Sequence, residues 1–455
     1  MTQTVLEILR RGLRITLTSL HQMQAMFRSK RMFRTPFHRF FLLFIFSVQF
    51  LHAQILVPMD ESNQRDHLRA YGLMYSAIEQ GYNCHWLLNY RGGSFAILNA
   101  DQNIVREAIK RGVSYESTSE GVLLAIMNSL QSPAENTNTV ELQKVPKIAV
   151  YSPPGAQPWD DAVTMVLTYA DIPFTTIYDQ EILNGSLGDY QWLHLHHEDF
   201  TGQYGKFYGS YRDAAWYINQ KAAFEAAARE MGYTKVSRQK GAVAQSIAAY
   251  VKEGGFLFAM CSATDSYDIA LAAINTDICE PMFDGDGMTP GAAYALDYSA
   301  TFAFDKFELF TNPMRYEYSN IDVTEQRIRV MKEPKDFFEL FDFSAKYDVV
   351  PTILVQNHTD LVRGFYGQTT AYRPATIKPS TTILGKSVVD GAARYIHGSY
   401  GEGYWTFYGG HDPEDYQHRV GDPPTDLNNH PNSPGYRLIL NNILFPAAKK
   451  PPQKT

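Results

Sequence analysis

Short apolar runs alternate with segments that carry apolar residues at helical spacing over residues 54–261. The runs predict strands, namely QILVPMD (54–60), CHWLLNY (84–90), KIAVYSP (147–153), FTTIYD (174–179), YQWLHLHHEDF (190–200) and FLFAMC (256–261). The spaced segments predict helices, namely QRDHLRAYGLMYSAIEQG (64–81), EGVLLAIMNSL (120–130), WDDAVTMVLTYA (159–170) and GAVAQSIAAYVKEG (241–254). This alternation favours an α/β fold with a mostly parallel sheet covered by helices on both faces. Such sheets bind ligands beyond the carboxyl ends of their strands.

The pattern changes after residue 280. Short alternating stretches then predict antiparallel strands, namely TFAFDKFELF (301–310), YEYSNIDVT (316–324), RIRVM (327–331) and VVPTILVQNH (349–358). The strand YWTFY and a final helix opened by Ser433 and Pro434 return to the first pattern. The predicted organisation is therefore an N-terminal β-α-β unit (54–146) ending in a polar linker, a core in two parts (147–280 and 391–447), a β-rich insertion (281–390) and a disordered tail (448–455).

The first 53 residues resemble a secretory signal. A basic stretch, RSKRMFRTPFHR, precedes the apolar run FFLLFIFSVQF, and Ala53 offers a small residue for cleavage. The run is too short to span a bilayer comfortably, although a retained anchor is the alternative. Residues 1–25 exceed what a signal needs, so translation from Met26 or Met32 is also an alternative. We therefore expect an exported protein, periplasmic or extracellular, with no stable membrane span after cleavage.

Composition limits the classes of partner that the protein can bind and the ways in which its cysteines can pair. The net charge is −7 with no basic block in the body of the chain, which disfavours nucleic acid as a partner. Aromatic residues make up 13% of the chain. They could lie in the core and in tyrosine-rich surface loops, or they could form platforms on which sugars stack. A small-molecule substrate, carbohydrate among the candidates, is the expected partner. The 3 cysteines leave at least one thiol unpaired, and a Cys261–Cys279 disulfide is compatible with the spacing.

Cys261 ends the apolar run GGFLFAMC, immediately before a predicted helix. A helix N-terminus or a neighbouring base lowers a thiol pKa and makes a nucleophile. His411 is the candidate base, because it follows two glycines at the end of a strand and precedes Asp412 and Glu414, which could orient its ring. The alternatives are a small core cysteine and a histidine that caps a helix.

A third candidate is the stretch LHLHHEDF (193–200). On a strand, His194 and His196 share one face and His197 takes the other. Neighbouring imidazoles beside Glu198 and Asp199 are compatible with a divalent metal. Hydrogen-bonded lining of a pocket is the preferred interpretation, so we expect no resident cofactor. The candidate substrate-binding residues are His196, His197, Glu198, Asp265 and Tyr408.

Three stretches carry a family resemblance: VKEGGFLFAMCSATDS (251–266), GEGYWTFYGGHDPEDY (401–416) and SPGYRLILNNILFPA (433–447). They resemble trehalose-utilisation-type (ThuA-like) proteins of the class I glutamine amidotransferase-like superfamily, over residues 147–280 and 391–447. The resemblance implies a flavodoxin-like sheet. ThuA-like proteins usually carry histidine at the position of Cys261, whereas the amidotransferases keep a cysteine and pair it with His-x-Glu. Glu414 lies three residues after His411, so either Asp412 or Glu414 would orient the ring.

The full chain also resembles bacterial proteins labelled asparagine synthetase B. Those enzymes carry a cysteine directly after the initiator methionine and a Ser-Gly-Gly-x-Asp-Ser loop for ATP. Here Thr2 occupies the first position, and the stretch RGGSF (91–95) does not match the loop. These departures disfavour that activity.

The expected function is hydrolysis of a small amide or a carbohydrate-derived substrate. Cys261 would attack, His411 would take its proton, and backbone N–H groups after Cys261 would hold the oxyanion. Two alternatives stay open. One is a carbohydrate-binding protein without catalysis, and the other is a metal-dependent hydrolase that uses residues 194–199.

Overall fold

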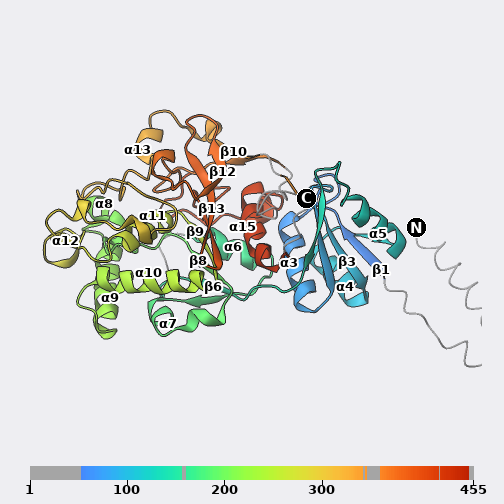
Figure 1. The fold of residues 1–455 in the computed structure, drawn as a ribbon, viewed down its shortest axis with the longest axis horizontal. Coiled ribbons are helices and arrows are strands. Elements are labelled where there is room, and N and C mark those ends of the chain that lie inside the picture. Colours follow the sequence, from blue (N-terminus) through green and yellow to red (C-terminus); the bar gives the residue numbers. More distant parts are fainter. Residues whose placement is uncertain (1–52, 156–159, 342–343, 346–358, 420, 450–455) are drawn as a thin grey trace, which may run out of the picture. The chain divides into compact units, whose positions relative to one another are not determined.

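A computed structural model describes residues 53–155, 160–341, 344–345, 359–419 and 421–449, which contain two β-sheets with helices packed on them (Figure 1). The predicted signal segment lies outside the described residues, apart from Ala53, where the first strand begins. None of the helices in the described part of the chain has the length and apolarity that a membrane crossing requires. The first two residues of the predicted disordered tail instead bind the N-terminal sheet, since Ala448 bridges to Leu142 and Lys449 donates to the Glu141 carbonyl.

The N-terminal sheet has five strands in the order β4-β1-β3-β2-β5, and every neighbouring pair is antiparallel. Its elements are β1 (Ala53–Val57), α3 (His67–Glu79), β2 (Asn83–Leu88), β3 (Phe95–Ala100), α4 (Gln102–Arg111), β4 (Glu116–Thr118), α5 (Glu120–Ser129) and β5 (Asn138–Leu142). The predicted β1, α3 and β2 are present, but β3 lies between the two strands. The segment expected to be a polar linker contains β5, whose buried Asn138, Val140 and Leu142 alternate with half-buried residues.

The second sheet has nine strands in the order β11-β10-β12-β13-β14-β9-β8-β6-β7. Its parallel half contains β7 (Thr175–Ile177), β6 (Ile148–Tyr151), β8 (Trp192–Leu195), β9 (Phe256–Met260) and β14 (Gly403–Tyr408). Its antiparallel half adds β13 (Ala393–Tyr400), β12 (Thr382–Ser387), β10 (Phe337–Leu340) and β11 (Leu361–Arg363). The expected α/β class with parallel strands is confirmed at this level.

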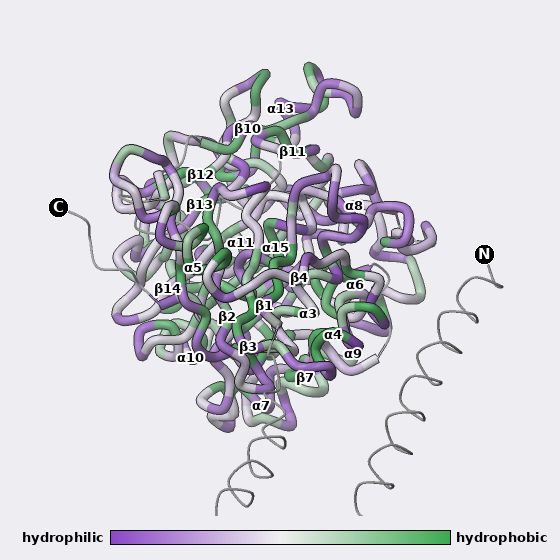
Figure 2. Tube along the Cα trace, turned by 90° about the vertical axis from the view of Figure 1, so that its right-hand side faces the viewer, coloured by the Kyte–Doolittle hydropathy of each residue, from purple (hydrophilic) through white to green (hydrophobic). Residues whose placement is uncertain are grey.

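Helices cover both faces of the parallel half. Side chains alternate along β6, so that Ile148 and Val150 belong to one hydrophobic core, and Ala149 and Tyr151 to a second core across the sheet. The first core includes α3, α6 (Ala162–Tyr169) and α15 (Pro434–Leu444), and the second includes α10 (Val236–Lys252) and α11 (Ala263–Ala272). The strands β1 and β3 are mainly hydrophobic in Figure 2, whereas the loops around them are mostly hydrophilic.

Local signals explain where two of these helices begin. Ser433 accepts a hydrogen bond from the Tyr436 amide and caps α15, as predicted, with Pro434 at its first position. Asp161 caps α6 by accepting from the amides of Val163 and Thr164. The sequence prediction missed α9 (Ala215–Glu230), which is rich in alanine, a strong helix former. It was missed because α9 has no apolar stripe and follows a loop rich in tyrosine and glycine.

The region expected to be a β-rich insertion contains few strands. The stretches 301–310 and 316–324 are mainly irregular and contribute isolated bridges, such as Phe304 to Ile377 and Asp322 to Tyr372. The predicted strand over 327–331 is wrong, because the short helix α13 (Thr324–Arg327) ends there and a turn follows. The predicted strand over 349–358 lies outside the described residues. Much of this region is held by side-chain bonds to the backbone, which alternation of residue type does not reveal.

Candidate active site

Three loops meet where the parallel strands β8, β9 and β14 end. They begin with His196, Cys261 and Gly409, the residues that follow those strands. The Cys261 amide donates to the Gly410 carbonyl at 3.0 Å, and the Ala263 amide donates to the His196 carbonyl at 3.2 Å. The strand order therefore brings the candidate cysteine, the histidine stretch and His411 to one edge of the sheet, as ligand binding at such an edge requires.

His196, His197 and His411 form what we call the three-histidine cluster. The ring centroid of His196 lies 4.6 Å from that of His411 and 5.1 Å from that of His197. One ring nitrogen from each residue can be chosen so that all three lie within 4.8 Å of one another. Both ring nitrogens of His196 and Nδ1 of His411 are buried. None of these three atoms has a hydrogen-bond partner in the described part of the chain.

Burial keeps the rings of the cluster neutral. It lowers the pKa of His411 to about 3 and that of His197 to about 4, and neighbouring imidazoles add to both shifts. Burial also lowers the pKa of His196 well below its ordinary value. Neutral imidazole is the form that binds a metal ion, so the three rings are electrostatically suited to be ligands.

Asp161 and His194 extend the cluster. His194 Nε2 lies 3.3 Å from Asp161 Oδ1, and its Nδ1 lies 3.1 Å from the Phe258 carbonyl oxygen. The same aspartate oxygen is 3.8 Å from His196 Nδ1. Although burial opposes its ionisation, the His194 and His196 rings hold the pKa of Asp161 well below its usual range. Asp161 was not singled out from the sequence, where an aspartate before a helix indicates only a cap.

Two flat side chains fix the orientation of His411. The Phe365 ring stacks on it with a centroid separation of 5.3 Å, and the His418 ring stacks on it at 5.5 Å. His418 in turn contacts Asp415 through Nδ1 at 3.0 Å. Neither Phe365 nor His418 could be predicted as a neighbour of His411 from the sequence, because their approach to its ring depends on loop conformation.

Cys261 has the backbone of a strained turn and the environment of a core residue. Its φ is +49°, in the left-handed region that non-glycine residues rarely adopt. Its thiol donates to the Gln368 carbonyl at 3.4 Å, and burial raises the thiol pKa to about 12. All three cysteines are free, so the Cys261–Cys279 disulfide alternative is wrong.

The described residues show no hydrogen bond between the Cys261 thiol and the His411 ring, although the two backbones are adjacent. Two of the N–H groups expected to hold an oxyanion already have partners, because the Ala263 amide donates to His196 and the Thr264 amide to Cys261. The thiol lies near the buried Asp265, which accepts from the Thr369 hydroxyl at 3.0 Å. Burial raises the pKa of Asp265 well above its ordinary value.

The carboxylates after His411 contact other groups. Asp412 accepts a hydrogen bond from the Glu414 amide at 2.8 Å. The Glu414 carboxylate lies 3.2 Å from His430 Nδ1. Tyr408 lies in the hydrophobic core, where its ring packs against those of Phe338 and Tyr395.

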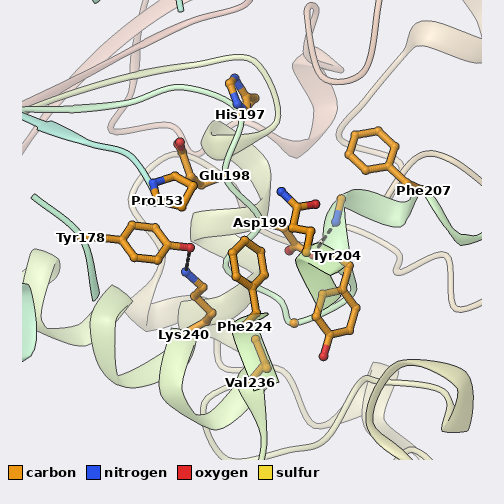
Figure 3. Close-up of a pocket in the computed structure, with 13 residues that line it drawn as sticks. Pro153, Tyr178, His197, Glu198, Asp199, Tyr204, Phe207, Phe224, Val236 and Lys240 are labelled. Atoms are coloured by element: carbon orange, nitrogen blue, oxygen red, sulfur yellow. Dashed lines mark hydrogen bonds between the residues drawn. The ribbon is translucent and has the colours of Figure 1, made fainter. Parts of the chain in front are cut away.

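A pocket opens beside the three-histidine cluster (Figure 3). His197 and Glu198 line it, and so do the aromatic side chains of Tyr178, Tyr204, Phe207 and Phe224. Lys240 also lines the pocket and donates to the Tyr178 hydroxyl at 2.9 Å. Glu198 accepts a hydrogen bond from the His196 amide at 3.0 Å, and burial raises its pKa to about 7. The predicted pocket-lining residues His197 and Glu198 thus share one pocket.

Comparisons with known proteins identify no family. No family model matches the chain, and no curated protein matches it. Among solved structures, two cytoplasmic proteins from Salmonella typhimurium are similar to this chain. Each alignment covers 67% of this chain and 100% of the other protein, with 11% and 10% sequence identity and TM-scores of 0.32. A β-galactosidase from Bacillus circulans sp. alkalophilus is similar over 58% of this chain and 28% of its own, with 10% identity and a TM-score of 0.23. Likenesses this weak say nothing about function.

Proposed function

We propose that the protein is a metal-dependent hydrolase in which His196, His197 and His411 bind one divalent cation. The observation that carries the proposal is the convergence of three neutral imidazoles with ligand atoms within 4.8 Å of one another. Burying a polar atom without a partner costs about 1–3 kcal/mol, and His196 and His411 both bury such nitrogens within the described structure. A bound cation would supply the missing partner.

The residue types and the pocket support hydrolysis. Three histidines are a ligand set of catalytic zinc, which keeps a fourth position for water. Zinc lowers the pKa of that water to about 7 and so generates a nucleophile. His197 and Glu198 both line the pocket, so His197 would connect the cation site to it and Glu198 would accept a proton there. The aromatic walls favour a small amide or ester, or a carbohydrate-derived molecule, as substrate.

The strand order supports a more specific fold. Numbered along the chain, the parallel strands β6, β7, β8, β9 and β14 lie in the order 2-1-3-4-5, which is the flavodoxin-like order. We infer from this order, and from the resemblance of the Cys261 and His411 segments, that residues 147–280 and 391–447 form an amidotransferase-like core. In such a sheet the carboxyl edge is the ligand-binding edge.

Metal analysis and hydrolysis assays on the purified full chain test the function. We expect bound zinc by mass spectrometry, hydrolysis of at least one member of a panel of nitrophenyl esters, amides and glycosides, and loss of that activity with a chelator. His196→Gln and His411→Gln should each lower activity by on the order of 100-fold or more. His397→Gln, which removes a buried histidine of β13, is the matched control. A protein that binds no divalent cation would overturn the proposal.

A second candidate function is hydrolysis by the Cys261 thiol. The positive φ of Cys261 at a strand-to-helix junction favours it, because nucleophiles at such junctions are held in strained turns. Cys261→Ser should then abolish turnover while zinc content stays unchanged. Rapid alkylation of Cys261 by iodoacetamide in the folded protein would support this function, whereas reaction only after unfolding would exclude it.

A further inference from the structure

We infer that the site holds two divalent cations, and that the His196 imidazole bridges them. The second cation would lie among Asp161, His194 and His196, while the first lies among His196, His197 and His411. This inference rests on the proposed function, since it takes the three-histidine cluster as the first site. Both residue groups have ligand atoms within 4.8 Å of one another, and His196 belongs to both.

The environment of His196 carries the inference. The side chain is fully buried, and neither of its ring nitrogens has a hydrogen-bond partner among the described residues. Its Nδ1 faces Asp161 Oδ1 at 3.8 Å. We assign its Nε2, at the other corner of the ring, to the first cation, beside the rings of His197 and His411. A buried imidazole with acceptor groups or other imidazoles near both nitrogens is suited to bind a cation through each of them.

One of the two ligand separations from Asp161 in the second group matches a tetrahedral cation, and the other is longer. Zinc bonds of about 2.0–2.1 Å place neighbouring ligand atoms about 3.3 Å apart in a tetrahedron. The separations from Asp161 Oδ1 are 3.3 Å to His194 Nε2 and 3.8 Å to His196 Nδ1. Small side-chain shifts would bring both ligands to bonding distance.

The groups around the second site orient its ligands. The Phe258 carbonyl lies 3.1 Å from His194 Nδ1 and so favours the tautomer that is protonated there, which leaves the Nε2 lone pair toward Asp161. The amides of Val163 and Thr164 donate to Asp161 Oδ1 and fix the carboxylate at the start of α6. The competing interpretation is a polar contact between Asp161 and His194 that involves no cation.

Binding at both nitrogens has a defined proton balance. Neutral imidazole carries one N–H proton, so the second cation displaces that proton from His196 to solvent and leaves a bridging imidazolate. No electron is transferred. Loading should therefore release one more proton from the wild-type protein than from a variant that binds the first cation alone.

Zinc titration of the metal-stripped full chain tests the inference, with bound metal measured by mass spectrometry. We expect two zinc ions per chain in the wild type and one in Asp161→Asn. Asparagine caps helices as well as aspartate does, so this variant keeps the start of α6. Asp101→Asn is the matched control, because Asp101 caps α4 and has no histidine beside it among its hydrogen-bond partners. The control should bind two.

The remaining outcomes separate the two proposals. One zinc ion in both the wild type and Asp161→Asn overturns the second site and leaves the proposed function standing. One in the wild type and none in Asp161→Asn also overturns the bridge, because the single cation then depends on Asp161. No zinc in the wild type overturns both proposals.

Copper(II) provides a probe of the bridge itself. Two Cu²⁺ ions joined by an imidazolate couple antiferromagnetically, so the wild type loaded with two ions should lose most of its paramagnetic resonance signal at low temperature. Two ions with full, uncoupled signal would overturn the bridging role of His196.

Discussion

Two buried polar clusters contact Phe365, and one is built from ionised groups whereas the other is built from neutral rings. In one, Asp336 accepts hydrogen bonds from Arg327 and Arg394, and all three side chains are at most 1% exposed. Both arginines also donate to the Phe365 carbonyl at 3.3 Å. In the other, the Phe365 ring stacks on His411, whose Nδ1 has no hydrogen-bond partner in the described structure.

This difference distinguishes a structural cluster from the cluster that we propose to bind a cation. The two arginine charges are balanced inside the chain by Asp336 and by Asp390, which lies 3.6 Å from Arg327 Nε, and removal of one partner leaves an unpaired buried charge. Neutral imidazoles with unpartnered nitrogens cost stability in the free protein and gain it when a cation binds. Mutations in the two clusters should therefore affect stability and function differently.

The largest effect is expected at Asp336. Asp336→Ala leaves the buried Arg394 without its ion-pair partner and Arg327 with Asp390 alone, at 3.6 Å, and should lower the free energy of unfolding by about 3–5 kcal/mol. Urea denaturation measures this change. Glu116→Gln breaks a half-exposed pair with Arg91 and serves as control, with an expected loss below about 1 kcal/mol. A similar small loss for both variants would remove the distinction between the clusters.

Zinc should stabilise the protein through the three-histidine cluster. At a free zinc concentration of 100 times the dissociation constant, binding to the folded state alone adds about 2.7 kcal/mol for one site. Thermal unfolding with and without a chelator measures this gain. His196→Gln should abolish it, and His397→Gln should keep it. An equal gain in both variants would mean that zinc binds elsewhere.

His397 is a reference for the three-histidine cluster, because it is a buried histidine whose ring has a hydrogen-bond partner. Its Nδ1 lies 2.8 Å from the Thr406 hydroxyl, and burial lowers its pKa from 6.5 to about 3. Between these values the unfolded chain binds more protons than the folded one, so this residue's contribution to stability falls as the pH falls from 6.5 to 3. The stability difference between wild type and His397→Gln should change by about 1.4 kcal/mol per pH unit there and stay constant above pH 6.5. Urea titrations across this range would contradict the assignment if the difference stayed constant.

The sequence predicted the parts of the fold that depend on local signals. Apolar runs identified β8, β9 and β14, and Ser433 with Pro434 identified the start of α15. The position of β3 between β1 and β2 could not be predicted, because strand order depends on contacts between distant segments. The same limit explains the wrong strand prediction over 327–331, where a buried arginine binds Asp336 across a loop.

The candidate site also has parts that local sequence signals predict and parts that depend on contacts between distant segments. His196, His197 and His411 each follow a strand, so their positions in the sequence indicated a role at the sheet edge. Their convergence depends on the neighbouring positions of β8, β9 and β14. Asp161 was missed because a helix cap and a metal ligand require the same residue type, and only the structure shows it beside His194.

The smallest expected effect is at His411 in the metal-free protein. His411→Leu keeps a similar side-chain volume and removes a buried nitrogen without a partner, which should gain about 1–3 kcal/mol. It also loses ring stacking on Phe365 and His418, worth about 0.5–1.5 kcal/mol for each aromatic pair. The two terms nearly cancel, so the free energy of unfolding should change by no more than about 1 kcal/mol. Urea denaturation in chelator measures this change, and the same variant in zinc should lose the part of the stabilisation that the three-histidine cluster supplies. A loss as large as that of Asp336→Ala would mean that His411 supports the fold as the arginine cluster does, and the contrast between the two clusters would fail.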